Sequence, residues 1–392
     1  MSDWGRLGMT SEWRTIRAAD FIDFNPRLSL KKGAIATKVA MDKLKPFSKK
    51  IPEAEKAEFN SGAKFCNGDT VMARITPCLE NGKTAYVDML DDGEIGFGST
   101  EFIVMRAKTG VSDPQFVYYT AINPVFRNVA IKSMVGSSGR QRVQQSVLEE
   151  LELSVPDLGE QRRIGAFLAG LDEKIALNNR INDHLEQQAR TLYAKMFLNS
   201  SNNNVTTGTL SDIAVITMGQ SPSGSSYNED GDGEVFYQGR AEFGFRFPKR
   251  RLFTTEPKRM AEPGDVLLSV RAPVGDLNVA YERCCIGRGL GAIHSKTGHS
   301  SFVLYTIFAL RSQLDVFNGE GTVFGSINRD ALNAIPVDIP LVTQIDQFEA
   351  VAHPIDELIR TNYEENCRLE AIRDSLLPKL MSGEIDVSAV QL

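Results

Sequence analysis

The sequence predicts an α+β protein in which two mixed, mostly β domains are joined by two long coiled-coil helices. One observation behind this is a helical stretch that occurs twice: a single shift places Leu171-Asp172-Glu173-Lys174-Ile175 on Ile355-Asp356-Glu357-Leu358-Ile359. The other is that the segments ahead of the two copies share β-rich landmarks. We therefore expect an internal pseudo-two-fold repeat in four segments, residues 1–155, 156–199, 200–339 and 340–392.

Each helical copy carries a heptad, the apolar spacing that winds one helix around a partner. Arg373 stands where the first copy has Ala189 and breaks the second heptad. Both copies have two asparagines on the seam, and Asn facing Asn can hydrogen-bond where Asn facing Leu cannot. We therefore expect the copies to pair with each other, in either direction, through Ile164, Leu168, Leu171, Ile175, Asn178, Asn182, Leu185, Ile355, Ile359, Asn362, Asn366 and Leu369.

An ordinary helical core is the alternative explanation of these heptads. A first helix of about 39 residues would reach about 58 Å at 1.5 Å per residue, which favours a spacer. We expect it to open at Asp157, with Glu160 reaching back as in a capping box. The second helix is expected to begin after Pro340, with Thr343 and Asp346 as its capping pair.

The two mostly β segments share sequence landmarks, but the residues between these landmarks differ. Asn67-Gly-Asp-Thr-Val-Met-Ala-Arg-Ile-Thr-Pro corresponds to Pro263-Gly-Asp-Val-Leu-Leu-Ser-Val-Arg-Ala-Pro, ahead of the first helix and of the second. Residues 20–60 and 217–260 share no pattern beyond being basic. A polar linker is expected from Ser200 to Gly208. Two dissimilar surfaces on one repeated β-rich frame favour a protein that recognises two different targets.

Charge is distributed unevenly around a net value of −6. Residues 27–50 hold eight basic residues against one acid, and residues 240–259 hold seven against two, whereas the C-terminal helical stretch is acidic. Basic clusters interleaved with aromatic residues favour nucleic-acid contact over a merely solvated surface. The nominated DNA contacts are Lys31, Lys32, Arg74, Arg140, Arg142, Arg240, Arg246, Lys249, Arg250 and Arg271.

Composition excludes several other classes of protein. No apolar run is long enough to span a membrane and no signal peptide opens the chain, so a cytoplasmic protein is expected. Five cysteines without a C-x-x-C pair argue against a disulfide frame and against a zinc site, and no metal site is expected.

Two motifs resemble a catalytic loop and a nucleotide-binding loop, but we interpret both as structural. Asn123-Pro124-Val125-Phe126 approaches the Asn-Pro-Pro-Tyr/Phe loop of adenine methyltransferases, but no S-adenosylmethionine-binding turn precedes it. Gly287-Arg-Gly-Leu-Gly291 is expected to be a tight β-turn, because the residues after it read as a strand and not as the helix of a nucleotide site. No catalytic residues are nominated.

The landmarks resemble those of the specificity subunit of type I restriction-modification systems. Asn67-Gly-Asp-Thr, Ser99-Thr-Glu-Phe-Ile-Val and the closing Ser375-Leu-Leu-Pro-Lys-Leu-Met-Ser-Gly-Glu-Ile carry the resemblance, which covers nearly the whole chain. It implies two target-recognition domains, each reading half of a bipartite site in double-stranded DNA. It also implies an antiparallel pair of spacer helices on which two methylase subunits dock.

The resemblance further implies partners that carry the cofactors. Methylase subunits would bring S-adenosylmethionine, and endonuclease subunits that translocate DNA would bring ATP and Mg; this chain itself would hold no cofactor. Three alternatives stay open on the sequence alone. They are a coiled-coil scaffold, a stand-alone DNA-binding protein and an adenine methyltransferase that uses the Asn123 loop.

Overall fold

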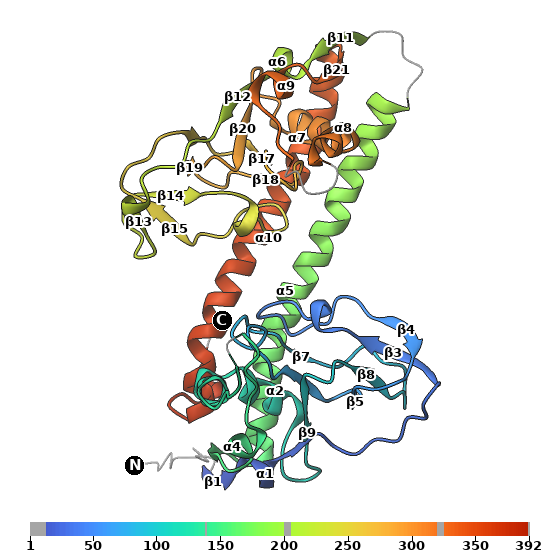
Figure 1. Ribbon diagram of the computed structural model, residues 1–392, viewed down its shortest axis with the longest axis vertical. Helices are drawn as coiled ribbons and strands as arrows, with labels where there is room; N and C mark the ends of the chain where they lie inside the picture. The colour runs from blue at the N-terminus through green and yellow to red at the C-terminus, as the bar shows by residue number, and fades with distance from the viewer. Residues whose placement is uncertain (1–12, 138, 200–204, 320–324, 391–392) are drawn as a thin grey trace, which may run out of the picture. The chain divides into compact units, whose positions relative to one another are not determined.

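The computed structural model describes residues 13–137, 139–199, 205–319 and 325–390 (Figure 1). The chain divides into two compact units, one holding the residues up to Asn178 and from Glu364 onward, the other residues Asn179–Tyr363. Each unit therefore contains one β-rich domain and a portion of both long helices, α5 (Leu158–Tyr193) and α10 (Val342–Ser382). Among the described helices, none is long and apolar enough to cross a membrane.

Unit 1 contains two four-stranded sheets and a strand pair. The antiparallel sheet has the order β2 (Ile22–Phe24), β9 (Phe102–Ala107), β6 (Thr70–Ala73), β7 (Thr84–Tyr86). The mixed sheet has the order β4 (Glu55–Glu58), β3 (Ile35–Val39), β8 (Gly96–Gly98), β5 (Ala63–Phe65), with β3 and β8 parallel. The unit also contains β1 (Arg14–Arg17) paired with β10 (Glu152–Val155), α1 (Ala18–Phe21), α2 (Pro114–Ile122), α3 (Pro124–Lys132) and α4 (Gln145–Glu149).

Unit 2 repeats this plan. Its antiparallel sheet has the order β12 (Ala214–Met218), β20 (Leu290–Ser295), β17 (Val266–Ser269), β18 (Leu277–Val279). Its mixed sheet has the order β13 (Tyr227–Asn228), β15 (Leu252–Thr254), β14 (Glu234–Tyr237), β19 (Cys284–Ile286), β16 (Met260–Ala261). The others are β11 (Val205–Thr209) paired with β21 (Pro336–Pro340), α6 (Leu210–Ile213), α7 (Ser300–Ala309), α8 (Arg311–Asp315) and α9 (Arg329–Asn333).

The strand orders confirm the internal repeat. In both mixed sheets the one parallel pair joins equivalent strands, β3 with β8 and β14 with β19. The landmark prolines Pro77 and Pro273 both follow a cis peptide bond. The predicted linker is only partly described, since residues 200–204 lie outside the described residues; Val205–Thr209 is a strand and not a linker.

The long helices run antiparallel within each unit. In unit 1 Asn178 Nδ2 donates to Asn366 Oδ1 at 2.9 Å while Arg373 reaches back to Asp172, and in unit 2 Asn362 Nδ2 donates to Asn182 Oδ1 at 2.8 Å. The structure thus decides the direction that the sequence left open. Of the nominated pairing residues, three are half-buried (Leu185, Ile355, Leu369) and the others are buried: Ile164, Leu168, Leu171, Ile175, Asn178, Asn182, Ile359, Asn362 and Asn366.

The helix starts agree only in part with the capping predictions. Asp157 Oδ1 accepts from the Glu160 amide at 3.0 Å, as predicted, but the Glu160 carboxylate pairs with Arg163 instead of reaching back. The predicted Thr343–Asp346 cap is wrong, because α10 has already begun at Val342 and Asp346 accepts from His299. The Gln344 side chain accepts from the Leu341 amide instead, at 3.3 Å.

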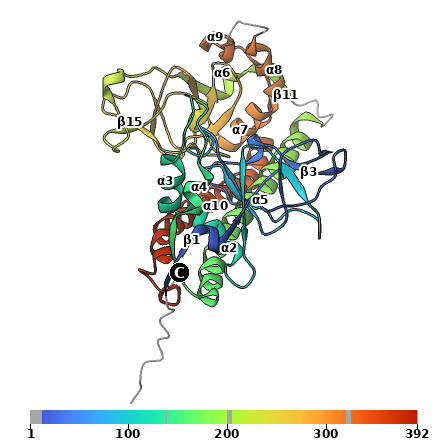
Figure 2. The ribbon, with the colours of Figure 1, turned by 60° about the horizontal axis from the view of Figure 1, so that its bottom comes forward.

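One short helix in each unit joins the antiparallel sheet to the long helices (Figure 1, Figure 2). In unit 1, Phe116 and Tyr119 of α2 share a core with Leu168 of α5 and Leu380 of α10. In unit 2, α7 supplies Phe302 and Tyr305 to a core that includes Ala189, Phe348 and Ala352 of the long helices. Each β domain therefore packs on the helix pair through an apolar face, and polar side chains at the margin of that face also contact the helices.

Candidate functional site

Three of the nominated basic residues of unit 1 meet beside the antiparallel sheet. The segment around Arg142 pairs with Ile75 and Val135, and the Val143 amide donates to the Arg74 carbonyl. Arg142 forks onto Glu101, with Nε and Nη2 at 2.9 and 2.6 Å from its oxygens, which lowers the pKa of that carboxyl. Arg140 is exposed and Arg74 half-buried. The structure thus brings together residues that are distant in sequence.

Lys31 and Lys32 lie elsewhere, in the turn that leads into β3 of the mixed sheet. Both side chains are exposed, and within the described part of the chain neither has an ion pair. Among the described residues, no hydrogen bond or ion pair of their side chains joins them to Arg74, Arg140 or Arg142. Lys31 and Lys32 therefore form a separate basic surface site on the first domain.

The loop between β14 and β15 carries most of the nominated residues of unit 2. Arg240 pairs with Asp276 at 2.5 Å, Arg250 Nη2 lies 2.8 Å from Glu282, and Lys249 is exposed. Arg271 is exposed just after β17, where its backbone bridges to Ser326. Arg271 and Arg142 therefore lie beside the equivalent cis-proline turns of the two domains.

Arg246 is placed where a DNA contact is not feasible, so its nomination is wrong. The residue is only 4% exposed, Nη1 lies 2.5 Å from Asp356 of α10, and Nη2 lies 3.0 Å from Glu186 of α5. Burial alone would lower the pKa of Arg246, but Asp356, Tyr305 and Glu186 raise it above its ordinary value. A guanidinium that is itself buried and pairs with two partly buried carboxylates is not free to reach a phosphate or a base edge.

Unit 1 has a comparable polar cluster on its own helix pair. Asp172 of α5 accepts from Arg373 of α10 at 2.7 Å and from the Tyr119 hydroxyl at 2.6 Å. Lys49, from the first basic cluster, lies behind Tyr119 with Nζ 3.3 Å from the hydroxyl oxygen. Asp356 in unit 2 likewise accepts from the Tyr305 hydroxyl, at 2.9 Å. Each helix pair therefore presents one aspartate to a tyrosine and a basic residue.

Lys49 is an unusually placed lysine. It is 5% exposed, and its ammonium lies 5.1–5.5 Å from the ring centroids of Tyr86, Tyr118 and Tyr119. Burial lowers the pKa of Lys49 to about 8, against the opposing field of Asp172. Aromatic faces attract a desolvated cation, which offsets part of the cost of burying it.

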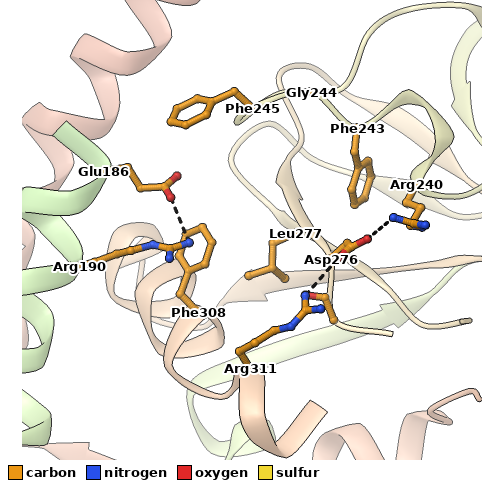
Figure 3. A pocket seen from close by; sticks show the side chains of 11 residues that line it. Glu186, Arg190, Arg240, Phe243, Gly244, Phe245, Asp276, Leu277, Phe308 and Arg311 are labelled. Atoms are coloured by element: carbon orange, nitrogen blue, oxygen red, sulfur yellow. Dashed lines mark hydrogen bonds and ion pairs between the residues drawn. The ribbon is translucent and has the colours of Figure 1, made fainter. Parts of the chain in front are cut away.

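An open cavity of about 500 Å³ lies in unit 2, and Glu186, an ion-pair partner of Arg246, is among the residues that line it (Figure 3). Figure 3 shows Phe243 and Phe245 on one side, the Glu186–Arg190 pair on α5, and Asp276 between Arg240 and Arg311. Arg190 stacks on Phe308 with its guanidinium carbon 3.8 Å from the ring centroid. Each arginine that lines the cavity already has a carboxylate partner, Glu186 for Arg190 and the shared Asp276 for Arg240 and Arg311, which weakens the cavity as an anion site.

The motifs that suggested chemistry have structural roles. Asn123 caps α3, with Oδ1 accepting from the Val125 amide at 3.0 Å. The Leu290 amide donates to the Gly287 carbonyl and strand β20 follows, which confirms the tight turn. In the part of the chain that the structure describes, no cluster of three His, Cys, Asp or Glu side chains could hold a metal.

Sequence reasoning missed the tyrosine–aspartate contacts, although signals for them were present. Asp172 and Asp356 coincide in the helical repeat, and Arg373 was the one break in a heptad. The α2 and α7 helices also share Phe-Val-x-Tyr-Thr, as Phe116-Val-Tyr-Tyr-Thr120 and Phe302-Val-Leu-Tyr-Thr306. The basic partners Lys49 and Arg246 lie in regions without sequence similarity, so no pattern could have paired them.

Comparison with known proteins shows which proteins this chain is similar to. Residues 11–187 match the family model described as type I restriction modification DNA specificity domain. The putative type I restriction enzyme MjaX specificity subunit of Methanocaldococcus jannaschii is 28% identical, over 82% of this chain and 79% of that protein. The EcoAI specificity subunit of Escherichia coli is 35% identical, over 32% of this chain and 20% of its own length.

A solved structure shares the fold over nearly all of both chains. The type I restriction-modification S subunit from M. genitalium has a TM-score of 0.56 and 17% identity, covering 97% of this chain and 99% of that one. The fold, the duplicated frame and the matched specificity domain agree with one another. The chain is thus similar in sequence to type I restriction enzyme specificity subunits, its residues 11–187 match their DNA specificity domain, and it shares the fold of one such subunit.

Proposed function

We propose that this chain is a non-catalytic subunit whose two target-recognition domains each read one half of a bipartite site in double-stranded DNA. The observation that carries the proposal is one frame used twice with dissimilar basic segments, residues 27–50 in unit 1 and 240–259 in unit 2, whose basic residues lie mostly in loops. A shared frame with different surfaces is what two different half-sites require, because sequence is read by side chains at base edges and not by the fold.

The proposed DNA contacts fall into two groups. Lys31, Lys32, Arg140, Lys249 and Arg271 are exposed, and among the described residues they have no ion pair, so they can meet phosphates directly. Arg142, Arg240 and Arg250 hold carboxylates in this structure and would exchange them for a phosphate or a guanine edge. Arg74, half-buried, would position the loop of Arg140 and Arg142.

We propose that the helix pair sets the unread spacer and provides docking ground for two methylase subunits. Val351 and Leu358 of α10 are exposed apolar side chains seven residues apart, so they lie on one face of the helix, which supports a protein contact there. The acidity of α10 supports the same conclusion, since a DNA duplex would be repelled there. Endonuclease subunits would join the methylases for restriction.

Catalysis and its cofactors belong to those partners in this proposal. S-adenosylmethionine would be bound by the methylases, and ATP and Mg by the endonuclease subunits. The Asn123 side chain accepts from a backbone amide as a helix cap, which leaves it unsuited to hold a flipped adenine. Methyl transfer by the purified chain alone would contradict this assignment.

The experiment is to co-express the chain with the methylase subunit encoded beside it and to map methylated adenines across the host genome. A single split motif, two short specific parts around a fixed gap, is the expected result. Methylation at a contiguous site would contradict the proposal that each domain recognises one half of a bipartite site. No methylation by a complex shown to be assembled would favour the scaffold alternative.

A further inference from the structure

The two basic loops are equivalent in one respect that their sequences hide. The carbonyl of Lys49 accepts from the Tyr86 amide at 2.9 Å, at the end of β7, and the carbonyl of Arg246 accepts from the Val279 amide at 2.8 Å, at the end of β18. Strands β7 and β18 hold the same edge position in the two antiparallel sheets. Lys49 and Arg246 therefore occupy the same place in the two domains.

Both side chains point inward from that place and not toward solvent. Lys49 is 5% exposed and Arg246 4% exposed, although each belongs to a cluster whose other members are mostly exposed. Each meets the hydroxyl of a tyrosine at the same position of its short helix, Lys49 with Tyr119 at 3.3 Å and Arg246 with Tyr305 at 3.4 Å. Each of those hydroxyls donates to the repeated aspartate of the long helix, Asp172 or Asp356.

The two connections differ in strength for a chemical reason. Arg246 can fork, so it reaches Asp356, Glu186 and Tyr305 at once and touches both long helices. Lys49 is a single point charge and reaches Asp172 only through Tyr119, while Arg373 supplies the direct ion pair. In both cases a basic loop is connected to the helix pair through buried polar atoms, where a change of position is costly.

We propose that Lys49 and Arg246 are positioning residues for recognition: each fixes the reading loop of its domain against the spacer helices and does not itself contact DNA. Arg246 lies three residues before Lys249 and four before Arg250, which the proposed function places on DNA. This inference rests on that function. A loop released from the helices keeps its charged residues but presents them in several orientations, so discrimination falls more than affinity.

The test uses the full chain co-expressed with its methylase, and methylation levels at the genomic motif and at single-base variants of it. Arg246→Met is expected to lower discrimination by tenfold or more at one half-site, with the other half-site and the spacer unchanged. Lys49→Met is expected to do the same at the opposite half-site. Arg246→Lys, which keeps the charge but cannot fork, should lie between Arg246→Met and the wild type.

Two exposed lysines of the same clusters, Lys45 and Lys258, provide matched controls as Lys45→Met and Lys258→Met. Equal losses in these variants would show that cationic charge and not buried positioning is responsible, which would overturn the inference. So would equal losses at both half-sites in a single variant. Where Arg246→Met fails to assemble, Asp356→Asn gives the second measurement, because it leaves the arginine in place with Glu186.

The outcomes separate this inference from the function on which it rests. A wild-type chain that directs no split motif removes the proposed function itself. A wild-type chain that directs one, with Lys49→Met and Arg246→Met retaining full discrimination at both halves, removes only the positioning role.

Discussion

Arg373 and Asp172 face each other across the helix pair of unit 1, with Nη1 and Oδ1 2.7 Å apart. Their side chains are 11% and 6% exposed, so the pair is largely shielded from water. Arg373 occupies the heptad position of α10 at which the first helical copy has Ala189, opposite the charge that it neutralises. The break in the heptad is therefore a specific contact and not a defect of the seam.

Arg373→Ala should destabilise unit 1 by roughly 3–5 kcal/mol, because it leaves Asp172 buried with no direct cation. Hydrogen exchange of the α2 and α5 amides at neutral pH measures this loss, and Arg368→Ala, on the exposed face of the same helix, is the control. Adding Asp172→Leu to Arg373→Leu should recover much of the stability. Protection that is unchanged in Arg373→Ala would contradict the assigned role.

Asn182→Leu should destabilise unit 2 by about 1–3 kcal/mol, since it leaves the Nδ2 group of Asn362 buried without its acceptor. Asn182→Leu combined with Asn362→Leu is expected to recover most of this, because two leucines pack on a seam where one leucine facing an asparagine does not. Thermal unfolding followed by circular dichroism measures both variants. If the double variant were no more stable than the single one, the asparagine pair would not be the cause.

Lys49 should make the stability of unit 1 depend on pH above neutrality. Its pKa is lowered from 10.5 to about 8 in the folded chain, chiefly by burial, so between those values the unfolded chain binds more protons. The free energy of unfolding should therefore rise with pH across this window, by no more than about 3 kcal/mol. This contribution is lost as the pH falls through about 8.

Lys49→Met removes the titrating group and serves as the reference for that measurement. The unfolding midpoints of the wild type and of this variant, taken at several pH values from 7 to about 10, should converge or cross in favour of the wild type as the pH rises. Parallel curves would mean that the ammonium is better hydrated than its 5% exposure indicates.

Glu349 should be required for the start of α7. Its carboxylate accepts from the Ser301 and Phe302 amides at 3.1 and 3.0 Å, and the residue ahead of the helix, His299, gives no side-chain cap. Glu349→Ala is expected to cost about 0.5–2 kcal/mol, as loss of a cap does, and Glu349→Gln less because an acceptor oxygen remains. Faster exchange of these amides checks it. The equivalent α2 is capped by its own Asp113 and should be unaffected.

Deleting one heptad from each long helix should shorten the unread spacer. Seven residues remove about 10 Å of helix at 1.5 Å per residue, or roughly three base pairs at 3.4 Å each. The methylation map described above reads the spacer directly, with both recognised parts expected to stay the same. A spacer of unchanged length would contradict the role of the helices as a ruler.

The sequence by itself determined the duplication, the two long helices and the seam asparagines, because repeats and heptads are local periodicities that a chain displays whatever its tertiary contacts. It also predicted two basic, dissimilar loops. The resemblance to type I specificity subunits rests on landmarks that recur in a fixed order, and the comparisons agree with it.

Only the tertiary structure decided the direction of pairing and the direction in which each basic side chain points. Nothing in residues 240–259 distinguishes Arg246 from Lys249, yet the first is buried against two carboxylates and the second is exposed. The difference arises because the partners of Arg246, Glu186 and Asp356, come from helices that are distant in the sequence. Whether a charged side chain faces solvent, contacts DNA or forms an ion pair depends on the groups that the fold brings within about 4 Å of it.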